Sequence, residues 1–248
     1  MNIEPSSTVS EVAIEIPGAI DLFERMRIDY SCRGGRSLAE ACDLAGVDAN
    51  EIIEELARLR AAMPEEALVN WFEKSLTDVI SYIVETHHHI EEEEIRKLGD
   101  EIVRLRDEEQ DSPDLKRIHA LFTTLTDNLA RHMLHEEREL FGRIARMERA
   151  AHDSGNEGSW RISVRNLVLT EFVEHDLMVE RLRNMRELTS SFTPPPDASA
   201  GVVALYAKLH ELDCELNRHM HLENNVLFPR ALEMENQLKQ ARYDSVAG

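Results

Sequence analysis

The residues of this sequence best suited to chemistry are histidines and glutamates that recur at one fixed spacing. The segment Arg131–Glu136 reads RHMLHE, and it is matched 87 positions later by Arg218–Glu223, which reads RHMHLE. The same offset pairs His88 with His175, and it selects His88 from a run of three consecutive histidines. Such self-similarity indicates a duplicated structural unit. The six repeated residues are His88, His132, Glu136, His175, His219 and Glu223.

In each half of the repeat, one histidine stands four positions before the glutamate. Residues at i and i+4 lie about 40° apart around a helix, so this imidazole and carboxylate can reach the same point. One such pair would be an ordinary feature of a helix, but two pairs with two further histidines at the same offset favour a metal site. Four imidazoles and two carboxylates without a thiolate suit iron, with manganese or zinc as competitors.

The number of ligands indicates how many ions to expect. Six ligands are too many for one tetrahedral zinc ion, whereas two irons that share both carboxylates keep open coordination positions. We therefore expect a dinuclear non-haem iron centre, bridged by the two carboxylates and by an oxo or hydroxo group. One zinc ion per chain would contradict this expectation.

Long helices are needed to bring these side chains together, and the composition favours them. The 248 residues are 42% hydrophobic and 31% charged, with only 10 glycines and 8 prolines, so we expect an all-α protein. Helix-start signals and short connections predict an antiparallel four-helix bundle made of two repeated hairpins. Its helices are expected from behind Ser75 to about 107, from behind Ser112 to about 151, over about 159–189, and over about 198–235.

The first part of the chain contains none of the repeated residues and is expected to form a small domain of short helices. Pro64 marks a break after it, because proline disfavours helical geometry in the residue before it. We therefore divide the chain into residues 1–66 and residues 67–248, the second part holding the bundle and its metal site. The short helices are expected over Val9–Ile14, Ile16–Met26, Leu38–Ala45 behind a capping box of Ser37 and Glu40, and about Asp48–Leu59.

Cys32 lies in the loop Asp29–Arg36 of this domain, beside two arginines and two glycines. Nearby cations favour a thiolate, so Cys32 could be a reactive thiol, although an exposed bystander cysteine is the simpler interpretation. Cys42 and Cys214 lie within helical patterns and are expected to be packing residues. Glu174, next to His175, could hold an imidazole or relay protons, and a solvated glutamate is an equal alternative.

Other polar residues are expected to face water or to lie beside the metal without binding it. A run of four acids on a long helix mostly faces solvent. The run is Glu91–Glu94, and the histidines assigned in this way are His89, His119, His135, His152, His210 and His221.

The charge balance excludes several classes of partner. With 28 basic and 48 acidic residues, the formal net charge is -20, which disfavours binding to nucleic acid or to an anionic membrane surface. No apolar run reaches the length of a membrane span, and no secretory leader pattern opens the chain. Three cysteines cannot form a disulfide framework. We expect a soluble, cytoplasmic protein.

Several motifs resemble a known family. Ile16–Pro17, Asp29–Cys32 (DYSC) and Ser37–Cys42 (SLAEAC) resemble the small N-terminal domain of the ScdA family, also called RIC, the di-iron "repair of iron centres" proteins. The stretch His219–Pro229 (HMHLENNVLFP) resembles a hemerythrin-like bundle. By this resemblance the metal ligands fall on the same six residues that the repeat selects. One departure is Ser31, because the family has adjacent cysteines in this loop, so a vicinal dithiol is not expected here.

The resemblance implies a stress-response role in repairing iron-sulfur clusters damaged by nitric oxide or peroxide. Damaged iron-sulfur proteins would be the partners, and the centre would donate iron or react with nitric oxide or oxygen. A nitric oxide reductase-type activity would make the chain an enzyme, and a homodimer is a further option. One alternative is a hemerythrin-like protein that binds or senses oxygen or nitric oxide without repair; another is a metal-free helical adaptor.

Overall fold

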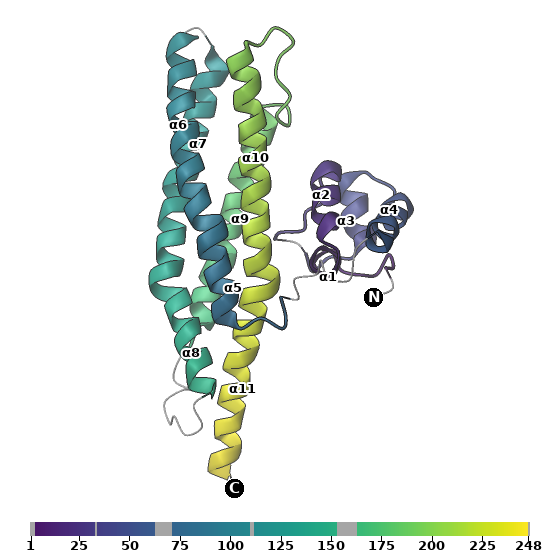
Figure 1. The fold of residues 1–248 in the computed structure, drawn as a ribbon, viewed down its shortest axis with the longest axis vertical. Helices are drawn as coiled ribbons and strands as arrows, with labels where there is room; N and C mark the ends of the chain where they lie inside the picture. The colour runs from purple at the N-terminus through teal and green to yellow at the C-terminus, as the bar shows by residue number, and fades with distance from the viewer. Residues whose placement is uncertain (1–2, 33, 63–70, 110–111, 153–162, 248) are drawn as a thin grey trace.

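A computed structural model describes residues 3–32, 34–62, 71–109, 112–152 and 163–247 (Figure 1). These described residues form helices and connecting loops, with one isolated antiparallel bridge between Thr8 and Ser37 and no β-strand. The expected all-α fold is therefore confirmed. None of the described helices is long and apolar enough to cross a membrane.

Four short helices build the N-terminal part. Thr8 caps the first helix and forms a reciprocal capping box with Glu11. At Ser37 only half of the predicted capping box is present. Glu40 donates its backbone N–H to Ser37, but its side chain pairs with Arg36 instead. A closed apolar core holds the four together. The helices are α1 (Val9–Glu15), α2 (Pro17–Met26), α3 (Leu38–Ala45) and α4 (Ala49–Ala61).

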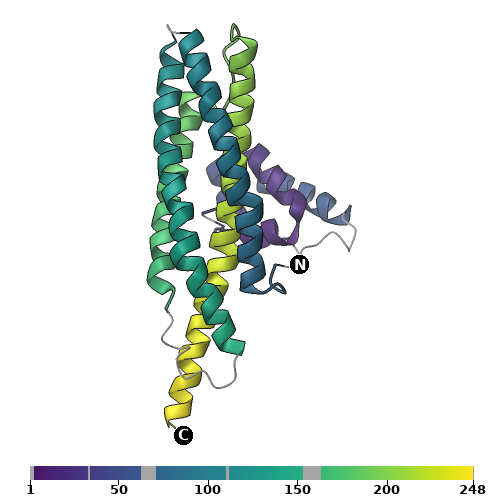
Figure 2. The same ribbon diagram turned by 60° about the vertical axis from the view of Figure 1, so that its left-hand side comes forward.

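The remaining chain forms four long rods that run side by side (Figure 2). Ser75, Ser112 and Ser199 cap the starts of three of them. The fourth rod runs to Ala247, beyond the expected end near 235, and its last part projects past its neighbours (Figure 2). The rods are α5 (Leu76–Tyr82), η2 (Ile83–His88) and α6 (His89–Glu108); α7 (Pro113–His135), η3 (Glu136–Phe141) and α8 (Gly142–His152); α9 (Arg165–Leu188); and α10 (Ala200–Leu222), η5 (Glu223–Leu227) and α11 (Phe228–Ala247).

The third long helix, α9, begins at Arg165, later than the predicted start near 159. Val164 precedes α9, and the predicted start near 159 lies outside the described residues.

Two buried carboxylates hold the starts of α5 and α9. Glu148 accepts the backbone N–H groups of Leu76 and Thr77 at 2.6 and 2.9 Å, and Glu235, 87 positions later, accepts those of Val164 and Arg165 at 2.8 and 3.0 Å. Acceptors at helix N-termini satisfy donors that have no partner inside the helix.

Three of the rods contain a π-helical segment, η2, η3 and η5. A π-turn inserts one residue into an α-helix and is frequent at functional sites. His88 ends the first segment, and Glu136 and Glu223 begin the other two. The repeat therefore extends to the backbone conformation, since Glu136 and Glu223 are the matched pair.

Two apolar clusters fill the bundle above and below a polar layer. One cluster includes Ile102, Leu129 and Leu216, and the other includes Ile83, Leu140 and Val226. Along every rod the repeated residues fall between members of the two clusters. The polar layer is thus sealed along the bundle axis by apolar side chains, which keeps bulk water away from it.

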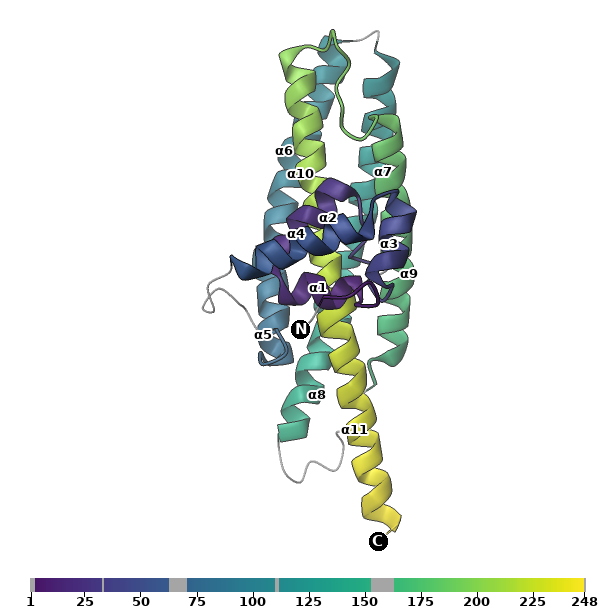
Figure 3. The ribbon, with the colours of Figure 1, turned by 90° about the vertical axis from the view of Figure 1, so that its right-hand side faces the viewer.

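The N-terminal helices lie against the side of the bundle at α10 and η5 (Figure 3). Arg218 binds the Glu24 carboxylate with two nitrogens at 3.0 and 2.8 Å. Ser31 donates to the Asn217 side-chain oxygen at 2.9 Å, and the amide of Asn225 donates to the backbone oxygen of Tyr30 at 3.2 Å. The loop that contains Cys32 is therefore fixed on the bundle.

Candidate metal centre

The structure brings the six repeated residues together in the polar layer of the bundle. They form two groups in which ligand atoms lie within 4.8 Å of one another, and both groups share the two glutamates. All six residues are at most 5% exposed. The groups are His88, His219, Glu136 and Glu223, and His132, His175, Glu136 and Glu223.

Each group is built around two imidazole Nε2 atoms that face each other. His88 and His219 approach to 3.1 Å at these atoms, and His132 and His175 do the same. Glu223 reaches one histidine of each pair, with Oε1 3.0 Å from His219 and Oε2 3.2 Å from His175. Glu223 therefore reaches both pairs of imidazoles and could contact a cation held by either pair.

Glu136 occupies the matching position on η3. Its Oε2 lies 3.5 Å from Nε2 of His88 and 3.4 Å from Nε2 of His132. Neither of its oxygens has a hydrogen-bond partner, nor does Oε2 of Glu223, although all three atoms are buried. Buried carboxylate oxygens without partners cost free energy unless a cation compensates them. The donor set therefore fits metal ions between the imidazoles.

The two buried carboxylates differ in protonation because their neighbours differ. Burial and the nearby Glu223 raise the pKa of Glu136 well above its usual value. Burial also acts on Glu223, but His219 and His175 outweigh it and hold the pKa of Glu223 well below its usual value. The pKa of His219 is raised by Glu223 and Glu91, against the opposing effect of burial. Without metal the centre therefore keeps protons that an incoming cation must displace.

Two of the imidazoles are oriented by a second matched pair that the sequence reasoning missed. His88 shares a hydrogen bond at Nδ1 with Oε1 of Glu137 at 2.8 Å. His175 shares one at Nδ1 with Oδ1 of Asn224, also at 2.8 Å. Residues 137 and 224 are again 87 apart, so the offset itself could have identified them. Fixing Nδ1 in this way leaves Nε2 free to bind a metal.

The other two imidazoles face carboxylates that break the repeat. Nδ1 of His219 lies 3.1 Å from Oε1 of Glu91, and Nδ1 of His132 lies 3.0 Å from Oε2 of Glu171. The expectation that Glu91 faces water is wrong, since it is 1% exposed. Charge runs predict solvated faces on average, but here one acid of four points into the bundle. Glu171 stands four positions before His175, but the repeat does not mark it, because Val84 occupies the matching position.

Cys32 and Glu174 do not reach the polar layer as ligands. Burial and then Asp29 raise the pKa of the Cys32 thiol to about 12, so the expected lowering by cations is wrong. Its Sγ accepts a hydrogen bond from the Asn224 amide at 3.3 Å. Glu174 is half-buried on α9, and among the described contacts none joins it to a ligand histidine. Glu171, one turn earlier, approaches His132 instead.

The other histidines are placed as follows. His135 shares Oε1 of Glu171 at 2.8 Å, in line with a position beside the centre. His221 is 2% exposed and contacts the carbonyl oxygen of Tyr30, so a surface position for it is wrong. His87 is buried against Glu215 at 2.6 Å. His89 is exposed. His119 contacts Arg106, and His210 contacts Cys214. The side chain of His152 lies outside the described residues.

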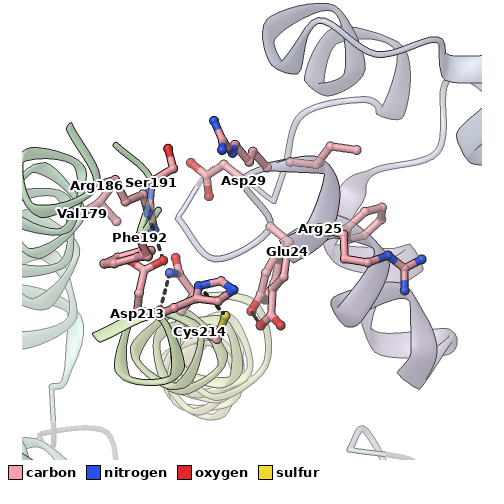
Figure 4. A pocket seen from close by; sticks show the side chains of 15 residues that line it. Glu24, Arg25, Asp29, Val179, Arg186, Ser191, Phe192, Asp213 and Cys214 are labelled. Carbon is pink, nitrogen blue, oxygen red and sulfur yellow. Dashed lines mark hydrogen bonds and ion pairs between the residues drawn. The ribbon is translucent and has the colours of Figure 1, made fainter. Parts of the chain in front are cut away.

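A separate pocket of about 310 Å³ lies where the N-terminal domain meets the bundle (Figure 4). Its lining combines Glu24 and Asp29 from the domain with Asp213 and Cys214 from α10. Arg186 pairs with Asp213 at 2.9 Å. Burial, then Glu24 and Asp213, raise the pKa of the Cys214 thiol to about 12. None of the six repeated residues lines this pocket, so it is distinct from the polar layer.

Comparison with known proteins identifies the family. Residues 5–60 match the ScdA N-terminal family, described as a domain of unknown function (DUF542). The iron-sulfur cluster repair protein YtfE of Musicola paradisiaca is 34% identical over 231 residues, which cover 92% of this chain and 97% of that protein. The proteins of the same name from Pectobacterium carotovorum and Escherichia coli are each 33% identical, with the same coverage. With this identity over nearly its full length, the chain belongs to the family of the iron-sulfur cluster repair protein YtfE.

Proposed function

We propose that this chain repairs damaged iron-sulfur clusters and that its polar layer holds two iron ions between the six repeated residues. One observation carries the proposal: two pairs of facing imidazoles share two buried carboxylates, and three of the four carboxylate oxygens have no hydrogen-bond partner. The relatives are named for the repair of iron-sulfur clusters, which supports repair as the role. Damaged iron-sulfur proteins would be the partners, and iron the exchangeable cargo.

Iron bound there would supply exchangeable metal and redox chemistry toward small ligands such as nitric oxide or oxygen. The chain itself performs three tasks. Glu137, Asn224 and Glu91 fix the tautomers of three imidazoles so that Nε2 faces the centre. Glu136 and Glu223 offer two negative charges once the displaced protons have left. The apolar clusters on both sides limit the access of water.

The proposal extends to the organisation of the chain and its surroundings. The chain is divided into a small N-terminal domain, residues 1–66, and a hemerythrin-like bundle, residues 67–248. Glu174 would act beside the ligands or at an access channel, by holding an imidazole or relaying protons, and Cys32 would act as a thiol of the N-terminal loop. A cytoplasmic location and a homodimer belong to the same set of proposals. An oxo or hydroxo group shared by the two ions is part of the proposal and would still leave positions open for a small ligand.

The test combines metal content with a repair assay. We expect about two irons per chain, near-ultraviolet bands of an oxo-bridged pair, and reactivation of an aconitase damaged by nitric oxide. Glu223→Gln removes a carboxylate shared by both groups and should lose metal and reactivation together. Glu139→Gln is the matched control, because Glu139 is exposed and, among the residues that the structure describes, pairs with Arg143 on the next turn. One zinc per chain, or reactivation that persists after the metal is lost, would contradict the proposal.

A further inference from the structure

The two metal positions have the same ligand types, yet the groups behind their imidazoles differ. The first position lies between His88 and His219, and the second lies between His132 and His175. At the first position, Nδ1 of His88 shares a hydrogen bond with the Glu137 carboxylate at 2.8 Å. At the second position, the repeat-related His175 is backed by the neutral amide of Asn224 at the same distance. One half of the duplicated unit thus has an anion where the other half has an uncharged group.

The second imidazole of each position shows the same inequality. His219, in the first position, faces both oxygens of Glu91 at 3.1 and 3.3 Å. His132, in the second position, lies 3.0 Å from Oε2 of Glu171, but these two atoms lack the alignment of a hydrogen bond. The other oxygen of Glu171 is taken by His135 at 2.8 Å. The carboxylate behind His132 is therefore both shared and poorly aligned.

The group behind a ligand histidine affects how tightly the metal is held. A carboxylate that accepts the Nδ1–H bond increases the basicity of Nε2 and adds negative charge near the cation, and losing such a partner typically lowers metal affinity by about 10- to 100-fold. The first position has two aligned carboxylates of this kind. The second has one amide and one misaligned carboxylate.

We propose that the two positions are unequal and that the metal between His132 and His175 is the more weakly held and the first to leave. This inference rests on the proposed function, since it identifies which of the two ions would be exchanged. The shared Glu136 and Glu223 contribute to both positions, so the inequality arises from the groups behind the imidazoles.

The N-terminal loop gives a structural reason for an amide at position 224. The Asn224 Nδ2 donates to the carbonyl oxygen of Ser31 at 3.2 Å and to Sγ of Cys32 at 3.3 Å, while its Oδ1 accepts from His175. An ionised carboxylate only accepts hydrogen bonds and cannot make the first two contacts. The side chain that fixes the N-terminal loop is therefore the one that leaves His175 without an anionic partner.

The experiment measures iron release from the full chain. Protein loaded anaerobically with ferrous iron is mixed with excess chromophoric chelator, and the released iron is followed with time. We expect two phases of equal amplitude, with the faster at least about 10-fold faster, in line with the effect of such partners on affinity. Crystals stripped of half their iron should retain anomalous scattering between His88 and His219.

Two variants assign the phases. Asn224→Asp places a carboxylate behind His175 and should slow only the fast phase by about 10-fold, whereas Glu137→Gln should accelerate only the slow phase by a similar factor. Asn225→Asp is the control for the loop, because Asn225 also donates to Tyr30 and Ser31 but does not touch His175. Glu139→Gln controls for loss of an exposed charge. Neither control should move either phase.

The outcomes separate this inference from the proposed function. Two irons released at one common rate, or residual iron between His132 and His175, would overturn the inference and leave the di-iron proposal standing. A fast phase that Asn224→Asp and Asn225→Asp change equally would also overturn it, because loop release rather than the partner of His175 would then be responsible. A chain that binds no iron would overturn both.

Discussion

Glu136 and Glu223 show how identical side chains at matched positions acquire different protonation. Both are fully buried, but Glu223 has two imidazoles within 3.2 Å, whereas the nearest imidazole nitrogens to Glu136 are 3.4 and 3.5 Å away. Glu223 ionises first, and its charge then opposes ionisation of Glu136. The duplicated sequence therefore produces a centre that is asymmetric before any metal binds.

The first prediction follows from this asymmetry. Because the pKa of Glu136 is raised by burial and by Glu223, and that of His219 is raised by its carboxylates, metal must displace protons from the centre. Apparent ferrous affinity should therefore increase as pH rises from about 5 to about 8. Competition titrations with a chelator of known pH dependence would measure it, and calorimetry in two buffers should detect the released protons. An affinity that does not change with pH contradicts the assignment.

A second prediction concerns His221, which burial keeps neutral. Its pKa is lowered to about 4 from 6.5, so the unfolded chain binds this proton at a higher pH than the folded chain does. The stabilisation is complete above about pH 6.5 and is lost as pH falls toward 4. A shift of this size corresponds to about 3 kcal/mol.

Urea unfolding of the metal-free protein between pH 4 and pH 7 checks this effect. His221→Gln should flatten the decline in the free energy of unfolding over this range, and His89→Gln, at an exposed histidine, should leave it unchanged. Equal profiles for the wild type and His221→Gln would show that other groups cause the acid sensitivity.

Among the residues of the candidate metal centre, the sequence identified those that have a counterpart 87 positions away and missed those that have none. His88 and Glu136 were found because their partners stand 87 positions away, and Glu137 could have been found by the same rule. Glu91 and Glu171 were out of reach, because each is one acid among many on an acidic helix and has no repeated partner. Their inward orientation depends on how the rods pack, which spacing alone does not specify.

At the scale of elements, the starts of helices were predictable and their internal irregularities were not. Ser75, Ser112 and Asp48 cap helices as their side-chain chemistry dictates. The π-segments η2, η3 and η5 have no residue signature, because a single inserted residue is stabilised by tertiary contacts. The long α11 was also missed, since its polar end resembles a tail more than a packed helix.

The third prediction tests the carboxylates that hold helix starts from a distance. Glu148→Ala removes the acceptor for the backbone N–H groups of Leu76 and Thr77. The buried Leu76 N–H and the part-buried Thr77 N–H then lose this acceptor, which should lower the free energy of unfolding by about 1 to 3 kcal/mol. Glu235→Ala should have a comparable effect at the start of α9, because Glu235 has the same role there.

Denaturant unfolding with Glu233→Ala as control would test this role. Glu233 is exposed on α11, two residues before Glu235, and its described contact is a hydrogen bond from Gln237 on the next turn, so its loss should cost little. Glu148→Gln keeps one acceptor oxygen and should fall between the wild type and Glu148→Ala. A Glu148→Ala protein as stable as the control would mean that solvent replaces the carboxylate at the helix start.

At the scale of the whole molecule, the N-terminal domain and the bundle are joined through side chains that also serve the centre. Asn224 contacts both His175 and the loop residues Ser31 and Cys32. Its neighbour Asn225 extends the contact to Tyr30. Asn224 therefore connects the N-terminal loop directly to His175, whereas Asn225 holds the loop without touching that histidine.

The fourth prediction uses two adjacent glycines of that loop. A Cβ at Gly34 would lie 2.7 Å from Oδ1 of Asn225 and 2.7 Å from Cβ of Ser10, whereas a Cβ at Gly35 would meet nothing within 4 Å. Gly34→Ala should force the loop away from η5 and expose Cys32, and Gly35→Ala should leave it in place. The two variants differ by one position and carry the same added methyl group.

The rate at which Cys32 reacts with a thiol reagent reports the displacement directly. The partly buried Cys32, whose thiol pKa is raised to about 12, should react slowly in the wild type and in Gly35→Ala. It should react at least about 10-fold faster in Gly34→Ala, because a solvated thiol has a pKa near 8.5 and a far larger thiolate fraction. Performing the assay in a Cys42→Ala, Cys214→Ala background assigns the signal to Cys32. If Gly34→Ala leaves Cys32 as unreactive as Gly35→Ala does, the loop tolerates the methyl group, and the coupling through Asn224 cannot depend on this close approach.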